Sequence, residues 1–150
     1  MGLPGDAVSG NDYLEFARCL DSLIALNIKH RKSLPDLSKE LSIIAYAQEL
    51  CTVRCDIGRR TGKTRYIKER ADKNSLVVVA NRAVLETCFR DVNFEVKTAF
   101  QLERRSMGFE AKKNIYVDEP KLVFHDIDEL TFYKSFARNS DQTFILLGRS

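Results

Sequence analysis

Apolar residues recur at helical spacing over the first fifty positions of the chain. One pattern begins at Asn11 or Asp12, either of which can cap a helix, and places apolar side chains three or four positions apart. We expect the polar stretch 29–33 to end this helix. A second pattern of the same kind leads from position 37 and ends near Leu50, which predicts a second helix.

Beyond position 50, short runs of β-forming residues alternate with helical patterns. The run 75–80 is apolar on both faces, as a central strand of a parallel sheet should be. The polar residues 101–113 predict a loop. Strands are expected over 51–57, 75–80, 94–100, 114–117 and 143–147. Helices are expected over 62–71, 83–89 and 126–136.

This alternation of strands and helices predicts an α/β fold, a three-layer domain with a mainly parallel central sheet. With 150 residues, the chain is long enough to bury a core within one domain. We expect residues 1–50 to form an N-terminal helical segment that packs on a core formed by residues 51–150.

The amino-acid composition limits the classes of protein to which the chain can belong. Lys and Arg number 24 against 21 Asp and Glu, and the pI near 8.7 permits a nucleic-acid partner without requiring one. No apolar run approaches the roughly 20 residues of a membrane span, and the first ten residues do not resemble a signal peptide. Four scattered cysteines, with no further Cys or His pair, favour reduced thiols in the cytoplasm over a structural zinc site. They are Cys19, Cys51, Cys55 and Cys88.

A basic segment with two glycines lies between an expected strand and an expected helix. Glycine lets the backbone approach an anion, successive amides form a positive concavity, and the following helix adds the partial positive charge of its N-terminus. Lys63 would reach the β- and γ-phosphates of a nucleotide, and the Thr64 hydroxyl would hold Mg²⁺. The candidate nucleotide-binding residues are Gly58, Arg59, Arg60, Thr61, Gly62, Lys63 and Thr64.

This segment departs from the strict phosphate-loop pattern, which places its first glycine at the position of Ile57 rather than Gly58. A glycine-containing turn followed by a solvated basic helix is the alternative interpretation. The surrounding stretch 54–73 is rich in Lys and Arg, which suits either a contact with a nucleic-acid backbone or a plain solvated helix face.

A second motif follows well downstream, where the strand expected over 114–117 runs into two acids, Asp118 and Glu119. Strand ends of this kind bind ligands in α/β sheets, so Asp118 would contact Mg²⁺ and Glu119 would act as the general base toward water. The alternative is a strand that ends in an acidic turn before Pro120. Both motifs close a strand and occur in the order that a nucleotide site requires.

The GRRTGKT segment, the strand with its acidic pair and the late strand 144–148 resemble the P-loop ATPases that carry an additional catalytic glutamate. In particular, the chain is similar over about residues 50–150 to large-terminase packaging motors of tailed phages and to helicase-type, RecA-like cores. Their phosphate loops often lose the first glycine and have Arg after the remaining small residue, as in this sequence.

The resemblance implies a RecA-like P-loop NTPase in which the last strand separates the phosphate-loop strand from the strand with the acidic pair, and the run 75–80 lies outside them. It implies ATP and Mg²⁺ as cofactors and catalytic roles for Lys63, Glu119 and Arg59, the last as an arginine finger supplied in cis. It places Gly148 and Arg149 where the γ-phosphate is sensed. Work on nucleic acid, a phage origin, and partner subunits or a homo-oligomer are implied in the same way.

Two other functions fit the same residues. A nucleotide-binding regulator or adaptor would keep the fold and have little or no turnover. A small nucleotide kinase fits less well, because such enzymes carry an arginine-bearing lid for which the sequence gives no clear candidate. The expected function is therefore Mg²⁺-dependent hydrolysis of a nucleoside triphosphate, with ATP as the expected substrate.

Overall fold

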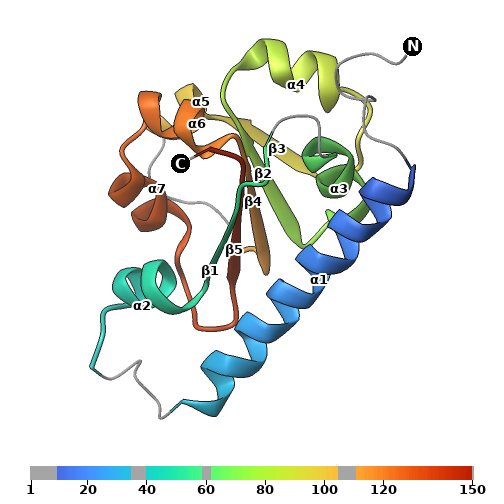
Figure 1. Ribbon diagram of the computed structural model, residues 1–150. Coiled ribbons are helices and arrows are strands. Elements are labelled where there is room, and N and C mark those ends of the chain that lie inside the picture. The colour runs from blue at the N-terminus through green and yellow to red at the C-terminus, as the bar shows by residue number, and fades with distance from the viewer. Residues whose placement is uncertain (1–9, 35–39, 59–61, 105–110, 150) are drawn as a thin grey trace.

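A five-stranded parallel sheet forms the centre of the molecule in the computed structural model, which describes residues 10–34, 40–58, 62–104 and 111–149 (Figure 1). The strands lie in the order β1-β5-β4-β2-β3, and every neighbouring pair is parallel. The expected α/β fold is therefore confirmed. The strands are β1 (Thr52–Cys55), β2 (Ser75–Val79), β3 (Glu95–Thr98), β4 (Asn114–Asp118) and β5 (Thr143–Leu147).

Three helices cover one face of the sheet (Figure 1). They are α1 (Gly10–Ser33), α3 (Lys63–Arg70) and α4 (Arg82–Cys88). Alternate strand residues such as Val77 and Ile145 form one buried cluster with Leu20 of α1 and Ile67 of α3. Since each aliphatic side chain buried in this way contributes about 1.5–3 kcal/mol, this packing accounts for the fixed position of α1 and α3 over the sheet.

Four shorter helices cover the opposite face (Figure 1). They are α2 (Ile43–Leu50), α5 (Ala99–Arg104), α6 (Pro120–Asp126) and α7 (Glu129–Phe136). The other set of strand side chains, including Leu76 and Val117, is buried there with residues of these helices. At the centre of this core the ring of Phe132 makes edge contacts, at centroid distances of 5.1–5.9 Å, with the rings of Phe124, Tyr133, Phe136 and Phe144.

The strand order agrees with the expectation drawn from the sequence resemblance. Strand β5 lies between β1 and β4 and pairs in parallel with both, and β2 pairs with β4 on its outer side. The residues Cys55 of β1 and Asp118 of β4 are both in register with Leu147 of β5. Consequently the three strands end at one level, and whatever follows them meets at the same edge of the sheet.

The first helix is longer than the sequence pattern predicts. We expected the polar stretch 29–33 to end it, but α1 continues to Ser33. Lys, His and Arg lose little free energy in a helix, and basic side chains in the last turn interact favourably with the negative end of the helix dipole. In addition, Arg31 donates from Nη1 to Oδ1 of Asn27 one turn earlier, at 3.0 Å.

Two further expectations are wrong in part. Positions 101–104 were expected in a loop but belong to α5, whose start is closed by reciprocal bonds between Thr98 and Gln101. The helix expected over 126–136 is α7, which begins only after Asp128, whose side chain accepts from the backbone amide of Thr131. Residue 126 instead ends α6, a helix that begins at Pro120 and was not expected from the sequence.

The two N-terminal helices lie on opposite faces of the sheet. Helix α1 contacts β1 and β5 on one face, and α2 contacts β1 and α7 on the other. Within the described ranges, no helix combines the length and the apolar character needed to cross a membrane.

Candidate functional site

The candidate residues from both motifs meet at the edge where the parallel strands end. Lys63 and Thr64 begin α3, which follows β1, and Asp118 and Glu119 close β4. Gly148 follows β5 between them, and its amide donates to the carbonyl of Cys55 at 2.8 Å. Parallel α/β sheets bind ligands at this edge, because the loops that follow the strands converge there.

Lys63 bridges the two motifs. Its ammonium nitrogen Nζ lies 3.1 Å from Oε1 of Glu119 and donates to the carbonyl oxygen of Gly58 at 3.0 Å. The lysine side chain is only 10% exposed, so its charge is partly desolvated and the ion pair is stronger than an exposed one. The lysine and the acid that were expected to face a nucleotide from two sides therefore contact each other directly.

Thr64 and Asp118 form the second contact between the motifs. The hydroxyl Oγ1 of Thr64 donates to Oδ2 of Asp118 at 3.1 Å. Asp118 is 6% exposed, and burial raises the pKa of its carboxyl to about 6; the bond from Thr64 and the charge of Lys63 oppose this rise, and the charge of Glu119 adds to it. A cation placed beside Asp118 would relieve the cost of burying its charge.

Glu119 is held in an uncommon backbone conformation. Its φ angle is 62°, in the left-handed region, and it is the one non-glycine residue with positive φ in the described part of the chain. Its amide donates to the carbonyl of Leu147 at 3.0 Å, and Pro120 starts α6 immediately after it. A Cβ at Gly148 would lie 2.8 Å from the carboxyl carbon and both oxygens of Glu119, so the carboxylate would have to shift from its present position.

Tyr13 of α1 is a site neighbour that the sequence analysis did not single out. Its ring is buried against Gly62, where a Cβ would lie 2.4 Å from ring carbon Cδ1. The guanidinium of Arg65 stacks over the same ring at 3.9 Å from its centroid, and the tyrosine hydroxyl donates to Glu69. Burial, followed by the bond to Glu69, raises the pKa of Tyr13 to about 12. Only the apolar spacing of α1 marked this residue, and that spacing indicated a core position.

Three of the expected nucleotide-binding residues, Arg59, Arg60 and Thr61, lie outside the described residues.

Within the described ranges no three His, Cys, Asp or Glu side chains gather to hold a metal, and the four cysteines are free thiols. Thr64 and Asp118 nevertheless offer a hydroxyl and a carboxylate oxygen side by side, and Mg²⁺ commonly takes one or two protein oxygens with phosphate and water oxygens completing its shell. The donor set therefore fits Mg²⁺ bound together with a phosphate.

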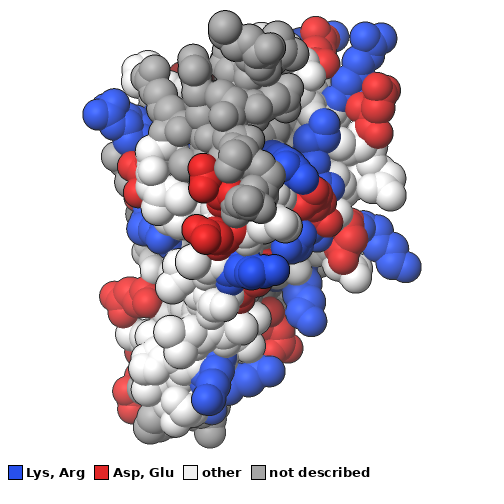
Figure 2. All heavy atoms as spheres, turned by 45° about the vertical axis from the view of Figure 1, so that its right-hand side comes forward, with Lys and Arg blue, Asp and Glu red and all other residues white. Residues whose placement is uncertain are grey.

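The basic stretch around α3 is largely neutralised by acids. Arg65 pairs with Glu69 at 3.3 Å, and Arg70 pairs with Asp21 of α1 at 2.9 Å. Figure 2, which brings the side of α1 and α3 forward, shows Lys and Arg interleaved with Asp and Glu rather than gathered into one basic surface. The interpretation of this stretch as a solvated, ion-paired helix face is therefore favoured over a nucleic-acid contact.

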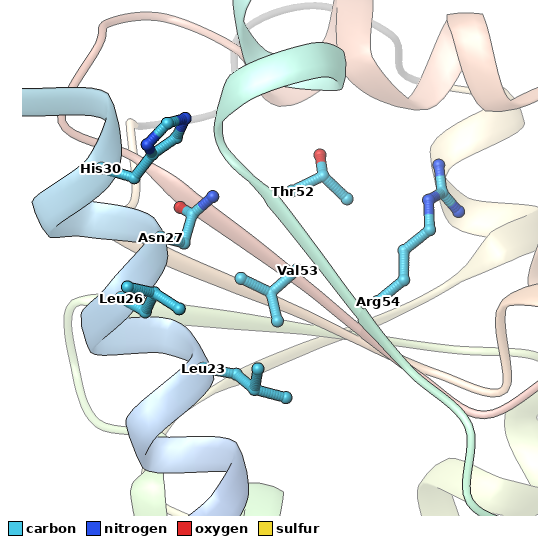
Figure 3. Close-up of a pocket in the computed structure, with 7 residues that line it drawn as sticks. All are labelled: Leu23, Leu26, Asn27, His30, Thr52, Val53 and Arg54. Carbon is cyan, nitrogen blue, oxygen red and sulfur yellow. The ribbon is translucent and has the colours of Figure 1, made fainter. Parts of the chain in front are cut away.

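A separate groove of about 360 Å³ runs between α1 and the outer edge of β1 (Figure 3). Leu23 and Asn27 of α1 point toward Val53 of β1, whereas the side chain of Arg54 extends away from α1. None of the residues expected to bind a nucleotide or metal lines this groove. It is therefore distinct from the site at the ends of the strands.

The site thus joins a lysine, a hydroxyl and two acids, all of which were expected from the motifs. Gly148, which the resemblance placed here, is a close neighbour, and Tyr13 is one that was not expected. No family model matches the chain, and comparisons with curated proteins and with solved structures find no match. The functional interpretation therefore depends on the geometry of these residues and on the two motifs.

Proposed function

We propose that this protein is a Mg²⁺-dependent P-loop NTPase with a RecA-like core that hydrolyses ATP. The observation that supports it is the double contact between two motifs far apart in the sequence: Thr64 with Asp118 and Lys63 with Glu119, each at 3.1 Å. Loops that follow neighbouring parallel strands converge in any such sheet, so the support comes from the side chains that meet: a lysine with one acid and a hydroxyl with the other. Their meeting at the ligand-binding edge of a parallel sheet favours a phosphate site with an acid pair.

In this proposal the start of α3 receives the phosphates. Gly58 and Gly62 both have positive φ, at 103° and 92°, which is a conformation that glycine adopts without strain. Such a loop, followed by the positive end of a helix, forms a concavity of amides suited to an anion. Lys63 then exchanges its contact with Glu119 for the β- and γ-phosphates, and this exchange leaves the Glu119 carboxylate available to a water molecule.

Thr64 and Asp118 are the residues that would hold Mg²⁺, which supplies charge stabilisation to the phosphates when bound. Glu119 accepts a proton from the attacking water as general base. Its position is set by its own backbone conformation and by the hydrogen bond from its amide to the carbonyl of Leu147, and Gly148 leaves room for its carboxylate. Arg59 would stabilise the charge that develops on the transferred phosphoryl group.

The biological task we propose is ATP-driven work on nucleic acid of the kind performed by phage packaging motors, with a homo-oligomer or partner subunits. It is supported only by the resemblance of the motifs, because a fold and a nucleotide site do not specify the process that they drive.

The direct test measures nucleotide affinity and phosphate release for the purified chain and three variants. Lys63→Ala should weaken Mg²⁺–ATP binding by about a hundredfold, since it removes a charge-assisted contact to the phosphates. Glu119→Gln should keep binding and lower turnover by about a hundredfold or more. Lys68→Ala is the matched control, because Lys68 is an exposed lysine on the same helix, and it should change neither quantity.

The outcomes separate the two functions left open by the sequence. Binding without turnover in the wild type would favour a nucleotide-binding regulator. Equal ATP affinity in the wild type and in Lys63→Ala would contradict both functions. A preference for GTP over ATP in the same titration would correct the expected nucleotide and leave the site assignment intact.

A further inference from the structure

A second pocket, which is polar and has a volume of about 580 Å³, lies at the opposite edge of the sheet, where the strands begin. It is bounded by the last turns of α1, by the residues that precede β4 and by the turn that precedes β5. Asn74, Lys113 and Gln142 stand directly before β2, β4 and β5 respectively. The pocket is therefore a sheet's length away from Lys63 and Asp118, which lie where the strands end.

The pocket wall includes a buried cation without an acidic partner. Arg31 is 6% exposed, and among the described residues its guanidinium donates to three neutral oxygens. These are Oδ1 of Asn27 at 3.0 Å, the carbonyl of Asp141 at 3.4 Å and Oγ1 of Thr143 at 3.1 Å. Within the described ranges no carboxylate forms an ion pair with it. Burying an uncompensated charge costs several kcal/mol, and an anion in the pocket would offset that cost.

Three lysines add to the positive charge of the same pocket. Lys32 and Lys113 are exposed at its mouth, and Lys112 lies deeper, where it pairs with Glu95 at 3.4 Å. Asp141 is the one acid among the lining residues. Among the described lining residues, four basic groups against one acid give a formal charge of +3, of which Glu95 offsets the share of Lys112, so the lining remains positive and favours anions.

We propose that this pocket binds a phosphate-bearing anion of up to nucleotide size. The buried guanidinium of Arg31 would compensate one phosphoryl group from the floor of the pocket, and Lys32 and Lys113 would approach it from the mouth. The amide side chains of Asn74 and Asn139 on the same wall offer neutral hydrogen-bonding groups to the rest of the ligand. A volume of about 580 Å³ is in the range of small-ligand sites. The inference is independent of the proposed ATP hydrolysis, because it uses other residues at the other edge of the sheet.

The test titrates ¹⁵N-labelled protein with inorganic pyrophosphate and follows the amide signals of Asn74, Lys113 and Gln142. These signals report the pocket itself and are insensitive to binding at Lys63. Lys32→Gln/Lys113→Gln removes two exposed charges and should weaken the pyrophosphate affinity read from these signals by about tenfold or more, since contacts between charged groups and a phosphate are stronger than neutral ones. The matched control, Lys29→Gln/Lys134→Gln, removes two exposed lysines that do not line the pocket and should leave that affinity unchanged.

Arg31→Lys is a second variant, which keeps the charge and loses the planar fork; it should weaken binding while the protein remains folded. The inference is overturned if pyrophosphate shifts none of the three signals at millimolar concentration, or if the control variant weakens binding as much as the pocket variant. Titration with a 5′-phosphorylated thymidine decanucleotide then identifies the kind of molecule whose phosphate group the pocket binds. Affinity tenfold above that of pyrophosphate assigns the site to a nucleic-acid strand, and equal affinity assigns it to a small phosphate compound. In either case Lys63→Ala should leave these signals responsive, so failure here and failure of the proposed function are distinguishable.

Discussion

The ring of Tyr13 in α1 lies directly over Gly62, the residue from which α3 starts, so that a Cβ at Gly62 would lie 2.4 Å from ring carbon Cδ1. The guanidinium of Arg65 also stacks over the same ring, at 3.9 Å from its centroid. The ring therefore has little room to move. Through this contact the N-terminal helix holds the residue at which the candidate phosphate loop turns into its helix.

Two glycine substitutions test this contact. Gly62 and Gly58 both have positive φ, so alanine at either position costs about 1–2 kcal/mol of stability from the backbone alone. At Gly58 a Cβ meets nothing within 4 Å among the described residues, whereas at Gly62 it collides with Tyr13. Gly62→Ala should therefore lose a further 1–3 kcal/mol or so in urea unfolding relative to Gly58→Ala. Equal losses would show that the Tyr13 ring moves aside without cost.

Alanine at Gly148 should act on turnover through Glu119. Its Cβ would lie 2.8 Å from the carboxylate atoms of Glu119, which must then shift away from the position set by Lys63. We expect phosphate release to fall by about a hundredfold or more, with a much smaller change in ATP affinity, because a displaced general base affects the reaction step.

A double-variant cycle with Glu119→Gln provides the control for this prediction. If Gly148→Ala acts by displacing Glu119, adding it to Glu119→Gln should lower turnover little further. Additive losses would mean that Gly148 acts on the site by another route, such as the strain of alanine at a φ angle of 120°.

Much of the sheet and the central contacts of the site could be predicted from the sequence. Strands buried on both faces, such as β2 and β5, appear as continuous apolar runs, and motifs that follow parallel strands meet at one edge. That rule predicts that Lys63 and Glu119 lie close together, but not that they contact each other directly.

The remaining features depend on tertiary contacts that no local pattern encodes. The pattern of α1 marked Tyr13 as a core residue, but nothing local indicated that its ring lies against Gly62. The polar Arg31 was expected to end that helix, yet it is buried because Asn27, Asp141 and Thr143 provide acceptors.

The stability of the metal-free protein should depend on the protonation of Asp118. Its pKa is raised from 3.8 to about 6, mainly by burial, so folding favours the protonated form. The stabilisation from protonated Asp118 is fully present below about pH 4 and is lost as the pH rises through 6. The free energy of unfolding should fall by an amount on the order of 2–3 kcal/mol over this range. Asp118→Asn keeps an acceptor for Thr64 and removes the charge, so its unfolding free energy should lack this decline. Identical pH profiles from pH 4 to 7 for the two proteins would contradict the prediction.

Two sets of contacts join α1 to α3: those of Tyr13 and those of Asp21. The second set can be tested apart from the site. Asp21 of α1 accepts hydrogen bonds from the hydroxyl of Tyr66 and from the guanidinium of Arg70, with Arg70 Nη2 at 2.9 Å. Asp21→Ala leaves the buried hydroxyl of Tyr66 without its acceptor, which should cost about 1–3 kcal/mol in chemical unfolding. Glu15→Ala, at an exposed acid of the same helix, is the control and should change stability by less than about 0.5 kcal/mol. If the two variants were equally stable, solvent would have replaced Asp21 as the partner of Tyr66 and Arg70, and α1 would be held to α3 by apolar packing and by the contacts of Tyr13.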